Sequence, residues 1–345
     1  MLQVVYHGYV AYLGVVNSLT FLALGDITAD SFITLQDASV HCAVETEACT
    51  ISMRWGDKIP YKDVVTIPAV GNSPNAAVCA ARLGIPTGLI SFVGNDRGGD
   101  ECVASLEKEG IDTSLINRES GKTTNHHYVL SFDAERTILV RHESFTYTLP
   151  TIPETVTWLY VSSVGSAAED LHDDIAEWAQ QHPNVKIVFQ PGTFQMSLGY
   201  DRLRKLYEAA HLFVCNKQEA QRILASNENS VRELLIALQK RGPAVVSITD
   251  GPAGAYAYDG NAMHKIPQYP DSSPPKERTG AGDAYTATLA AFLAKGLPLT
   301  EALLRAPINA MSVVQHVGAQ KGLLTEGDVE RYLAKAPDSY TVSSL

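Results

Sequence analysis

The stretch T-G-A-G-D-A-Y-T-A-T-L at residues 279–289 combines two glycines, one residue apart, with an alanine-rich continuation. Such glycines are unfavourable inside a helix, whereas the residues after them favour one. The pattern therefore predicts a tight loop that leads into a helix N-terminus. The first amides of a helix have no intrahelical partner and the helix dipole adds positive charge, so this loop can bind an anion.

Asp283 follows the second glycine directly. A carboxylate at the positive end of a helix is favoured in its charged form and is therefore available as a base. Two other interpretations stay open from this fragment alone. Asp283 could be a plain N-cap, since aspartate is a preferred cap. The glycines could also belong to a dinucleotide fingerprint, but Tyr285 stands where G-x-G-x-x-G requires its third glycine.

The composition is that of a globular protein, with 45% hydrophobic and 19% charged residues in a chain of 345. The length allows one large α/β domain or two ordinary ones. The formal net charge is −11 and the sequence contains no dense basic run, so we expect no nucleic-acid partner. It also contains no Walker A pattern, so a bound nucleotide needs a different loop.

The N-terminal region is apolar over residues 9–24, but polar residues interrupt it and no basic segment precedes it. It is too short and too polar to span a membrane, and it does not fit a secretory signal. We expect residues 19–24 to form a buried first strand and residues 1–18 to be an extension. The five cysteines are scattered, which favours reduced thiols and a soluble, cytoplasmic protein without a membrane partner.

Short apolar runs alternate with helical stretches along most of the chain. Residues 158–161 precede a helical pattern over 167–181, and residues 245–249 follow one over 231–241. The runs are apolar on both faces, as in strands that helices cover on each side. This alternation predicts an α/β fold with a central, mostly parallel sheet and right-handed crossovers.

Two segments break this alternation, at about residues 34–70 and 121–148. Residues 128–132 and 137–140 predict a hairpin around Asp133-Ala134-Glu135. Such insertions are either ordinary surface hairpins or a small β-sheet lid that shields a reacting centre from water. We expect a lid. We also expect a single domain over residues 19–335, followed by a C-terminal tail over residues 336–345.

His126 and His127 are neighbours in one of these predicted strands. Successive residues of a strand point to opposite faces of its sheet. The two rings are therefore not expected to bind one metal ion together.

The run at residues 279–283 resembles the C-terminal signature of the ribokinase-like (PfkB) carbohydrate kinase family, usually written D-T-T-G-A-G-D-x-F. The resemblance implies a ribokinase-like three-layer α/β/α fold with a small β-sheet lid. It also implies that Asp283 is the base that deprotonates the substrate hydroxyl. The amides that would form the anion hole for the transferred phosphoryl group are those of Gly280, Ala281 and Gly282.

Glu277 and Arg278 depart from this signature, because the family prefers Asp and Thr there. Residues near these positions help to bind a monovalent cation in many members of the family. The resemblance therefore leaves a requirement for K⁺ open.

Residues 71–77, G-N-S-P-N-A-A, look like the N-terminal signature of the same family. The resemblance places Asn75 against a sugar hydroxyl, although Asn75 could also simply cap a helix. Asp30 lies five residues after Gly25, as does the family's substrate-binding aspartate, and a carboxylate can accept two adjacent hydroxyls. The implied acceptor-binding residues are Asp30, Gly71, Asn72 and Asn75.

Asn216 and Glu219 resemble the family's N-x-x-E motif, which is linked to magnesium and phosphate. The same spacing also fits a capping box, in which Asn216 caps a helix and Glu219 reaches back. Residues 249–254 resemble the T-x-G-x-x-G turn that meets ATP phosphates, and residues 318–320 the final nucleotide-side loop. The implied nucleotide-side residues are Asn216, Thr249, Gly251, Gly254, Thr279, Asn309 and Gly318, with Glu219 as the metal candidate.

The resemblance covers roughly residues 19–330 with its motifs in the family's order. It implies in-line transfer of the γ-phosphoryl group of ATP, with Mg²⁺, to a hydroxyl of a small sugar. A nucleoside or vitamin kinase of the same family is the nearer alternative. A non-catalytic sugar- or nucleotide-binding regulator is the more distant one. An exposed lid edge needs covering, and lid-to-lid packing makes dimers in family members, so we expect a homodimer through the lid.

Overall fold

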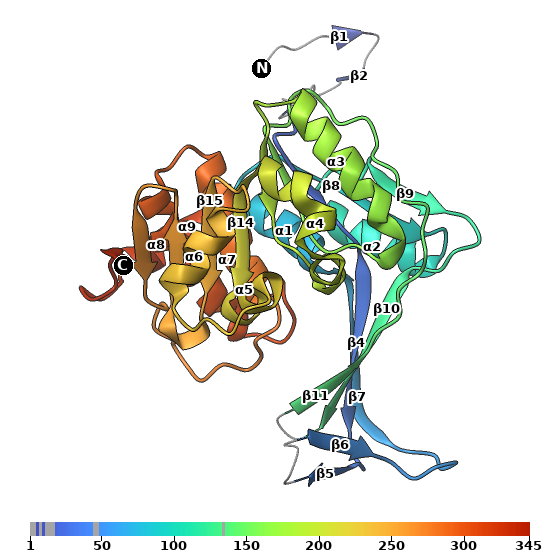
Figure 1. The fold of residues 1–345 in the computed structure, drawn as a ribbon. Helices are drawn as coiled ribbons and strands as arrows, with labels where there is room; N and C mark the ends of the chain where they lie inside the picture. Colours follow the sequence, from blue (N-terminus) through green and yellow to red (C-terminus); the bar gives the residue numbers. More distant parts are fainter. Residues whose placement is uncertain (1–4, 7–8, 11–17, 44–47, 133–134) are drawn as a thin grey trace.

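The computed structural model describes residues 5–6, 9–10, 18–43, 48–132 and 135–345 (Figure 1). Within them, a ten-stranded sheet in the order β18-β17-β16-β15-β14-β13-β12-β3-β8-β9 forms the centre of the fold. Neighbouring strands from β9 to β15 are parallel, and those from β15 to β18 are antiparallel. The strands are β3 (Phe21–Leu24), β8 (Thr87–Gly94), β9 (Ile116–Glu119), β12 (Trp158–Val161), β13 (Lys186–Phe189), β14 (Ala210–Asn216), β15 (Val245–Thr249), β16 (Ala255–Tyr258), β17 (Met263–Ile266) and β18 (Ser343–Ser344).

Helices cover both faces of this sheet because its central strands are apolar on both sides. In β3, Phe21 and Ala23 belong to one hydrophobic cluster, and Leu22 and Leu24 belong to the other. The first cluster includes α1, α7, α8 and α9, and the second includes α3, α4 and α6. The predicted three-layer α/β/α fold is therefore confirmed. The helices are α1 (Asn72–Arg82), α2 (Arg97–Lys108), α3 (Glu169–Gln181), α4 (Thr193–Ala209), α5 (Lys217–Leu224), α6 (Val231–Gln239), α7 (Ala281–Ala294), α8 (Leu299–Val314) and α9 (Glu326–Leu333).

A second, four-stranded sheet in the order β11-β10-β4-β7 is the predicted lid. Figure 1 shows its strands running away from the body toward a further hairpin, β5–β6. The predicted hairpin is confirmed by the antiparallel pairing of β10 and β11, while its turn at residues 133–134 lies outside the described residues. The strands are β4 (Thr28–Leu35), β5 (Ser39–Ala43), β6 (Ala48–Ser52), β7 (Tyr61–Val70), β10 (Asn125–Phe132) and β11 (Glu135–Leu139).

The lid begins six residues earlier than residue 34, because β4 starts at Thr28. Polar residues make this strand hard to detect in the sequence. One of them, Ser31, makes cross-strand contacts in the structure. Ser31 Oγ lies 2.7 Å from Thr66 Oγ1 and 2.9 Å from His126 Nε2. Asp30 is thus a residue of the lid sheet and not of a loop.

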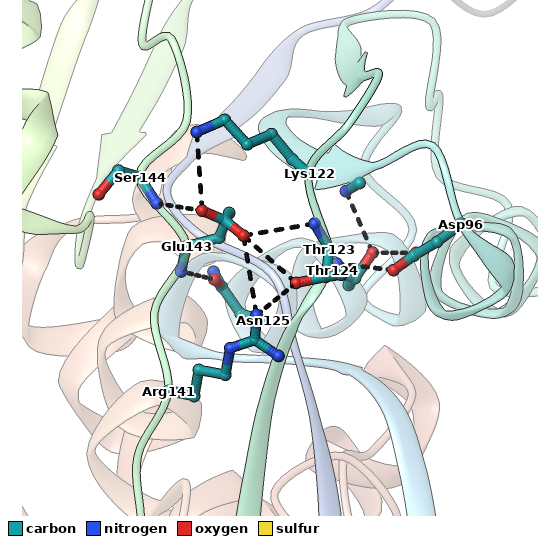
Figure 2. A network of polar contacts seen from close by, with 9 residues as sticks. Asp96, Lys122, Thr123, Thr124, Asn125, Arg141, Glu143 and Ser144 are labelled. Carbon is teal, nitrogen blue, oxygen red and sulfur yellow. Dashed lines mark hydrogen bonds and ion pairs between the residues drawn. The ribbon is translucent and has the colours of Figure 1, made fainter.

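A polar network fixes the base of the lid (Figure 2). Asp96 caps α2 by accepting from the amide of Gly99, and it also accepts from the amide and the hydroxyl of Thr124 at 2.9 and 2.6 Å. Asn125 donates to the carbonyl of Ile27 at 3.1 Å and accepts from the amide of Glu143 at 2.7 Å. The strands that lead into the lid are therefore tied to the body where they leave it.

The structure adds detail at both termini. The C-terminal tail, residues 336–345, packs on the body, because β18 pairs with β17 and Tyr340 is buried, with its hydroxyl donating to Leu304 O at 2.8 Å. Of the predicted extension, β1 (Val5–Tyr6) pairs with β2 (Tyr9–Val10), and most of the remainder lies outside the described residues.

The cysteines follow the prediction in part. Cys79, Cys102 and Cys215 are free and buried. Cys49 is disulfide-bonded, so the expectation of reduced thiols is wrong there; its register partner in the β5–β6 hairpin is Cys42. Among the described helices, none is both long and apolar enough to cross a membrane.

The integration of the C-terminal segment can be tested by the substitution Tyr340→Ala. Removing a buried aromatic ring and its hydrogen bond should lower the free energy of unfolding by about 3 kcal/mol, measured by urea denaturation. The matched change at exposed Thr341 to Ala should have little effect. Equal stability of the two variants would mean that the segment does not pack on the body.

Candidate active site

The loop at residues 279–283 and the helix α7 have the predicted arrangement. Gly280 is the N-cap of α7, with a φ of 81°, and a Cβ at this position would clash with Ala319. Only glycine adopts this left-handed conformation readily. Asp283 is the third residue of the helix, so the interpretation of Asp283 as an N-cap is wrong.

The Asp283 carboxylate is buried and receives three side-chain amides. Oδ1 accepts from Asn72 Nδ2 at 2.7 Å and from Gln190 Nε2 at 3.1 Å, and Oδ2 accepts from Asn75 Nδ2 at 2.8 Å. Hydrogen bonds to an ionised acceptor are stronger than neutral ones. The three amides and the N-terminus of α7 therefore fix the orientation of this carboxylate and offset its desolvation.

This arrangement changes the picture drawn from the sequence. Asn72 and Asn75, expected as ligands of the acceptor, hold the carboxylate of Asp283 in this structure. Gln190, which follows β13, was missed because no motif contains it. A general rule could have found it: ligands of open α/β sheets bind beyond the carboxyl ends of the strands.

One cavity, of about 300 Å³, lies between the lid and the N-terminus of α7. Gly71 lies in its wall with a φ of 126°, and a Cβ there would come within 2.7 Å of Asp26 O. We call it the acceptor-side cavity. Its lining residues are Thr28, Asp30, Phe32, Val70, Gly71, Asn72, Asn75, His127, Thr279, Gly280, Gly282, Asp283, Gly318 and Ala319.

A second cavity, of about 400 Å³, lies on the other side of the same loop, and we call it the donor-side cavity. Thr249, Gly251 and Gly254 line it as predicted, and so does Arg278. One face of α8 closes it with Pro307, Ala310, Met311 and Val314. These four residues have the spacing of a helical stripe, which was the available signal for this missed wall.

Four predicted nucleotide-side residues do not line the donor-side cavity, and one of them, Asn216, caps α5. Thr279 and Gly318 line the acceptor-side cavity. Asn309 is fully buried, donates to Thr288 Oγ1 at 2.9 Å and accepts from the amide of Leu324 at 3.0 Å. Its side chain is on the core face of α8, so the prediction that it contacts a nucleotide is wrong.

The two cavities meet at Gly282, which lines both of them. The start of α7 thus lies between a partly polar cavity and a largely apolar one. Molecules bound in the two cavities would therefore be nearest to each other at Gly282.

Asn216 and Glu219 form the reciprocal capping box of α5. Asn216 Oδ1 accepts from the amide of Glu219 at 2.9 Å, and Glu219 Oε2 accepts from the amide of Asn216 at 2.8 Å. Burial raises the pKa of Glu219 against the effect of the Asn216 amide, and the charge of Asp283 adds to the rise. A nearby cation would relieve both carboxylates.

This environment fits Mg²⁺, which takes few protein oxygens and keeps several waters. Among the described residues, no three or more His, Cys, Asp or Glu side chains form a group that could hold a metal ion alone. The metal would therefore need phosphate oxygens as its main ligands.

Glu277, which lies just before the loop at residues 279–283, contacts the lid. Its Oε2 accepts from the amide of Gly318 at 2.8 Å, and its Oε1 lies 3.4 Å from a guanidinium nitrogen of Arg136 in β11. The side chain of Glu277 is only 9% exposed. An ion pair with a buried carboxylate therefore links the lid to the segment before the loop.

The chain matches the model of the pfkB family carbohydrate kinases over residues 57–326. The match covers most of the chain and shows that it is of a class of small-molecule phosphotransferases. The chain belongs to the PfkB family of carbohydrate kinases.

Curated relatives agree with this membership. A ribokinase from Bacillus subtilis (strain 168) is 26% identical over 284 residues, which cover 81% of this chain and 92% of the relative. A nucleoside kinase from Methanothermobacter thermautotrophicus is 24% identical over 269 residues, which cover 77% and 84%. The chain is thus similar to both sugar and nucleoside kinases.

Solved structures show the same fold. Arabidopsis thaliana ribokinase complexed with ribose and ATP has a TM-score of 0.77 at 18% identity, over 91% of this chain and 98% of that one. An Escherichia coli candidate ribokinase II in complex with ATP and Mg²⁺ has a TM-score of 0.74 at 19% identity, over 92% and 99%.

Asp26 lies behind the acceptor-side cavity and is almost completely buried. Burial raises the pKa of its carboxyl to about 7, although the Tyr147 hydroxyl donates to both oxygens at 3.0 and 2.9 Å and opposes the rise. Between about pH 4 and about pH 7, the Asp26 carboxyl is therefore protonated in the native state but ionised in the unfolded chain, where an aspartate has its ordinary pKa near 4.

This difference makes a contribution to stability that is complete at low pH and is lost as the pH rises through about 7. Asp26→Asn removes the titration, so the fall in Tm between about pH 5 and about pH 8 should be smaller in this variant than in the wild type. Exposed Asp174→Asn serves as the control. Parallel pH profiles of wild type and Asp26→Asn would contradict the raised pKa.

Proposed function

We propose that the chain transfers the γ-phosphoryl group of ATP to a hydroxyl of a small sugar. The observation that carries this proposal is the position of Gly282 and Asp283 at the junction of the two cavities. In-line transfer requires an acceptor on one side of the phosphoryl group and a leaving diphosphate on the other. The two cavities supply these two sides.

The base is Asp283, whose carboxylate lines the acceptor-side cavity. It takes the proton of the acceptor hydroxyl while the hydroxyl oxygen bonds to the γ-phosphorus, and the bond from that phosphorus to the bridging oxygen of ADP breaks. The amides of Gly280, Ala281 and Gly282 stabilise the charge of the group in flight, because preorganised donors act most strongly on charge that develops in the transition state.

The donor-side cavity suits ATP in two ways. Thr249, Gly251 and Gly254 bring backbone close to where phosphates would lie, and the apolar stripe of α8 offers a surface for the base. Glu219 would hold Mg²⁺ through water, and the metal would neutralise charge on the β- and γ-phosphates. A K⁺ requirement is not part of the proposal, because the Glu277 carboxylate already contacts the Gly318 amide and Arg136.

A nucleoside kinase is the second candidate. The similarity to a nucleoside kinase supports it, and so do Phe32, Val70 and Ala319, which give the acceptor-side cavity an apolar part. No observation favours a vitamin as acceptor. A regulator without activity would not need a base, whereas here three amides orient the Asp283 carboxylate.

The substitution Asp283→Asn tests the catalytic assignment. Loss of the base should lower kcat by about 10²–10⁴-fold, measured by coupled ADP release with D-ribose, D-fructose or adenosine as acceptor. Asp174→Asn on the exposed face of α3 should keep wild-type turnover. A folded Asp283→Asn protein that retains near wild-type kcat would remove Asp283 from this role.

We also propose that a second copy of the chain covers the lid. Within the described residues, both outer strands of the lid sheet have an unpaired edge, and large apolar side chains on the sheet are about half exposed. Patches and edges of this kind mark interaction surfaces. The residues are Tyr61, Val64, Val65, Tyr128, Ile138 and Leu139.

Light scattering tests this dimer. The wild type should have the mass of a dimer at micromolar concentration, and the double variant Val65→Lys/Tyr128→Lys that of a monomer, because two charges would be buried unpaired. The added charge of Asn227→Lys, away from the lid, should not change the mass. A monomeric wild type would contradict the proposal.

A further inference from the structure

His127 has a place in the acceptor-side cavity that no part of the proposed mechanism uses. It lies in β10 directly beside Asp30 of the parallel strand β4. His127 Nδ1 is 3.3 Å from Asp30 Oδ1, and each side chain is 16% exposed. Both residues line the cavity.

Two atoms of this pair lack partners. Neither His127 Nε2 nor Asp30 Oδ1 has a hydrogen bond to any residue that the structure describes, although both atoms are buried. The approach of Nδ1 to Oδ1 does not have the geometry of a hydrogen bond. Buried polar atoms are normally paired, and leaving one unpaired costs about 1–3 kcal/mol. A ligand with hydroxyl groups would supply both partners.

A second histidine packs against the ring of His127. The ring of His142 stands edge-on to it with 5.1 Å between the ring centroids, and His142 Nδ1 lies 3.9 Å from Asp26 Oδ2. Burial lowers the pKa of His142, and the neighbouring His127 adds to this effect. The His127 ring is thus held in place by its packing against His142.

The charges around the cavity indicate the class of acceptor. Its lining contains the carboxylates Asp30 and Asp283 and, among the described residues, no Lys or Arg. The arginines near the lid are paired elsewhere, Arg136 with Glu277 and Arg141 with Glu143. A phosphate or carboxylate on the acceptor would meet two negative charges here, whereas hydroxyls meet good acceptors.

We propose, on the basis of the kinase function above, that His127 is an acceptor-binding residue that determines specificity. Asp30 accepts from one hydroxyl of an uncharged polyol, and His127 Nε2 forms a hydrogen bond with the adjacent hydroxyl. The pair therefore recognises two neighbouring hydroxyls on the part of the acceptor that lies against the lid.

His126 provides a matched control. It precedes His127 in the same strand but points to the opposite face, where its Nε2 lies 2.9 Å from Ser31 Oγ and its ring packs against Tyr128. It lines neither cavity. The same substitution at the two positions therefore separates loss of an acceptor contact from damage to the lid.

The experiment measures steady-state kinetics of the full chain with D-ribose, D-fructose and adenosine, each with saturating ATP. With the best of these acceptors, His127→Ala should raise the acceptor KM about tenfold, the effect of losing one hydrogen bond of about 1.4 kcal/mol. The KM for ATP and the Tm should stay near wild type. His127→Gln, which can place an amide near the position of Nε2, should restore most of the affinity, and His126→Ala should leave the acceptor KM unchanged.

Deoxy analogues of the same acceptor identify the contact. One of the deoxy analogues should lack the hydroxyl that His127 contacts. Its KM should be higher than that of the parent acceptor with the wild type, whereas with His127→Ala the two KM values should be nearly equal. If every deoxy analogue has the same relative penalty in both proteins, His127 does not contact the acceptor. An unchanged acceptor KM in His127→Ala would overturn the inference in the same way.

Failure of this inference differs from failure of the proposed function. If the wild type phosphorylates an acceptor and His127→Ala does so equally well, only the role of His127 is wrong. If the wild type phosphorylates none of the three acceptors, the sugar or nucleoside kinase function fails, and the inference fails with it.

Discussion

The hydrogen bonds from three side-chain amides to the Asp283 carboxylate are the constraint on which the site depends. A buried carboxylate without a cationic partner is costly unless several donors compensate it. The donors come from α1, which supplies Asn72 and Asn75, and from Gln190 after β13, while the carboxylate belongs to α7. Three separate segments must therefore keep their relative positions. Contacts deeper in the core, such as that of Cys79 with Thr288, join α1 and α7 along their length.

The acceptor-side cavity is shared between two parts of the molecule that the chain connects only at the base of the lid. Asp30 and His127 come from the lid sheet, whereas Gly280 and Asp283 come from the body. Any movement of the lid changes the distance between the residues that would bind an acceptor and the residue that would deprotonate it. The network around Asp96 and Asn125 limits this movement at the base, and the Arg136–Glu277 pair opposes it nearer the loop.

Local sequence patterns predicted local structure well. The glycine pair before α7 and the capping box of Asn216 and Glu219 depend on residues close in sequence, and both are present. The cavity that a loop lines depends instead on long-range packing. Thr279 and Gly318 therefore line the acceptor-side cavity and not the donor-side one, and Asn309 is buried in the core. Gln190 was missed because its contact with Asp283 exists only where β13 meets α7.

The two cavities differ in charge in a way that agrees with the proposed direction of transfer. The acceptor-side cavity has two carboxylates and no Lys or Arg among its described lining residues, whereas the donor-side cavity has Arg278 besides Asp271, and an apolar stripe. With no other Lys or Arg among its described lining residues, the donor side must meet most of the phosphate charge with backbone amides and a metal ion. Under the proposed function, a chain of net charge −11 would bind a polyanion through local groups at this cavity and not through its overall charge. The two carboxylates of the acceptor-side cavity, Asp30 and Asp283, suit a molecule with hydroxyl groups.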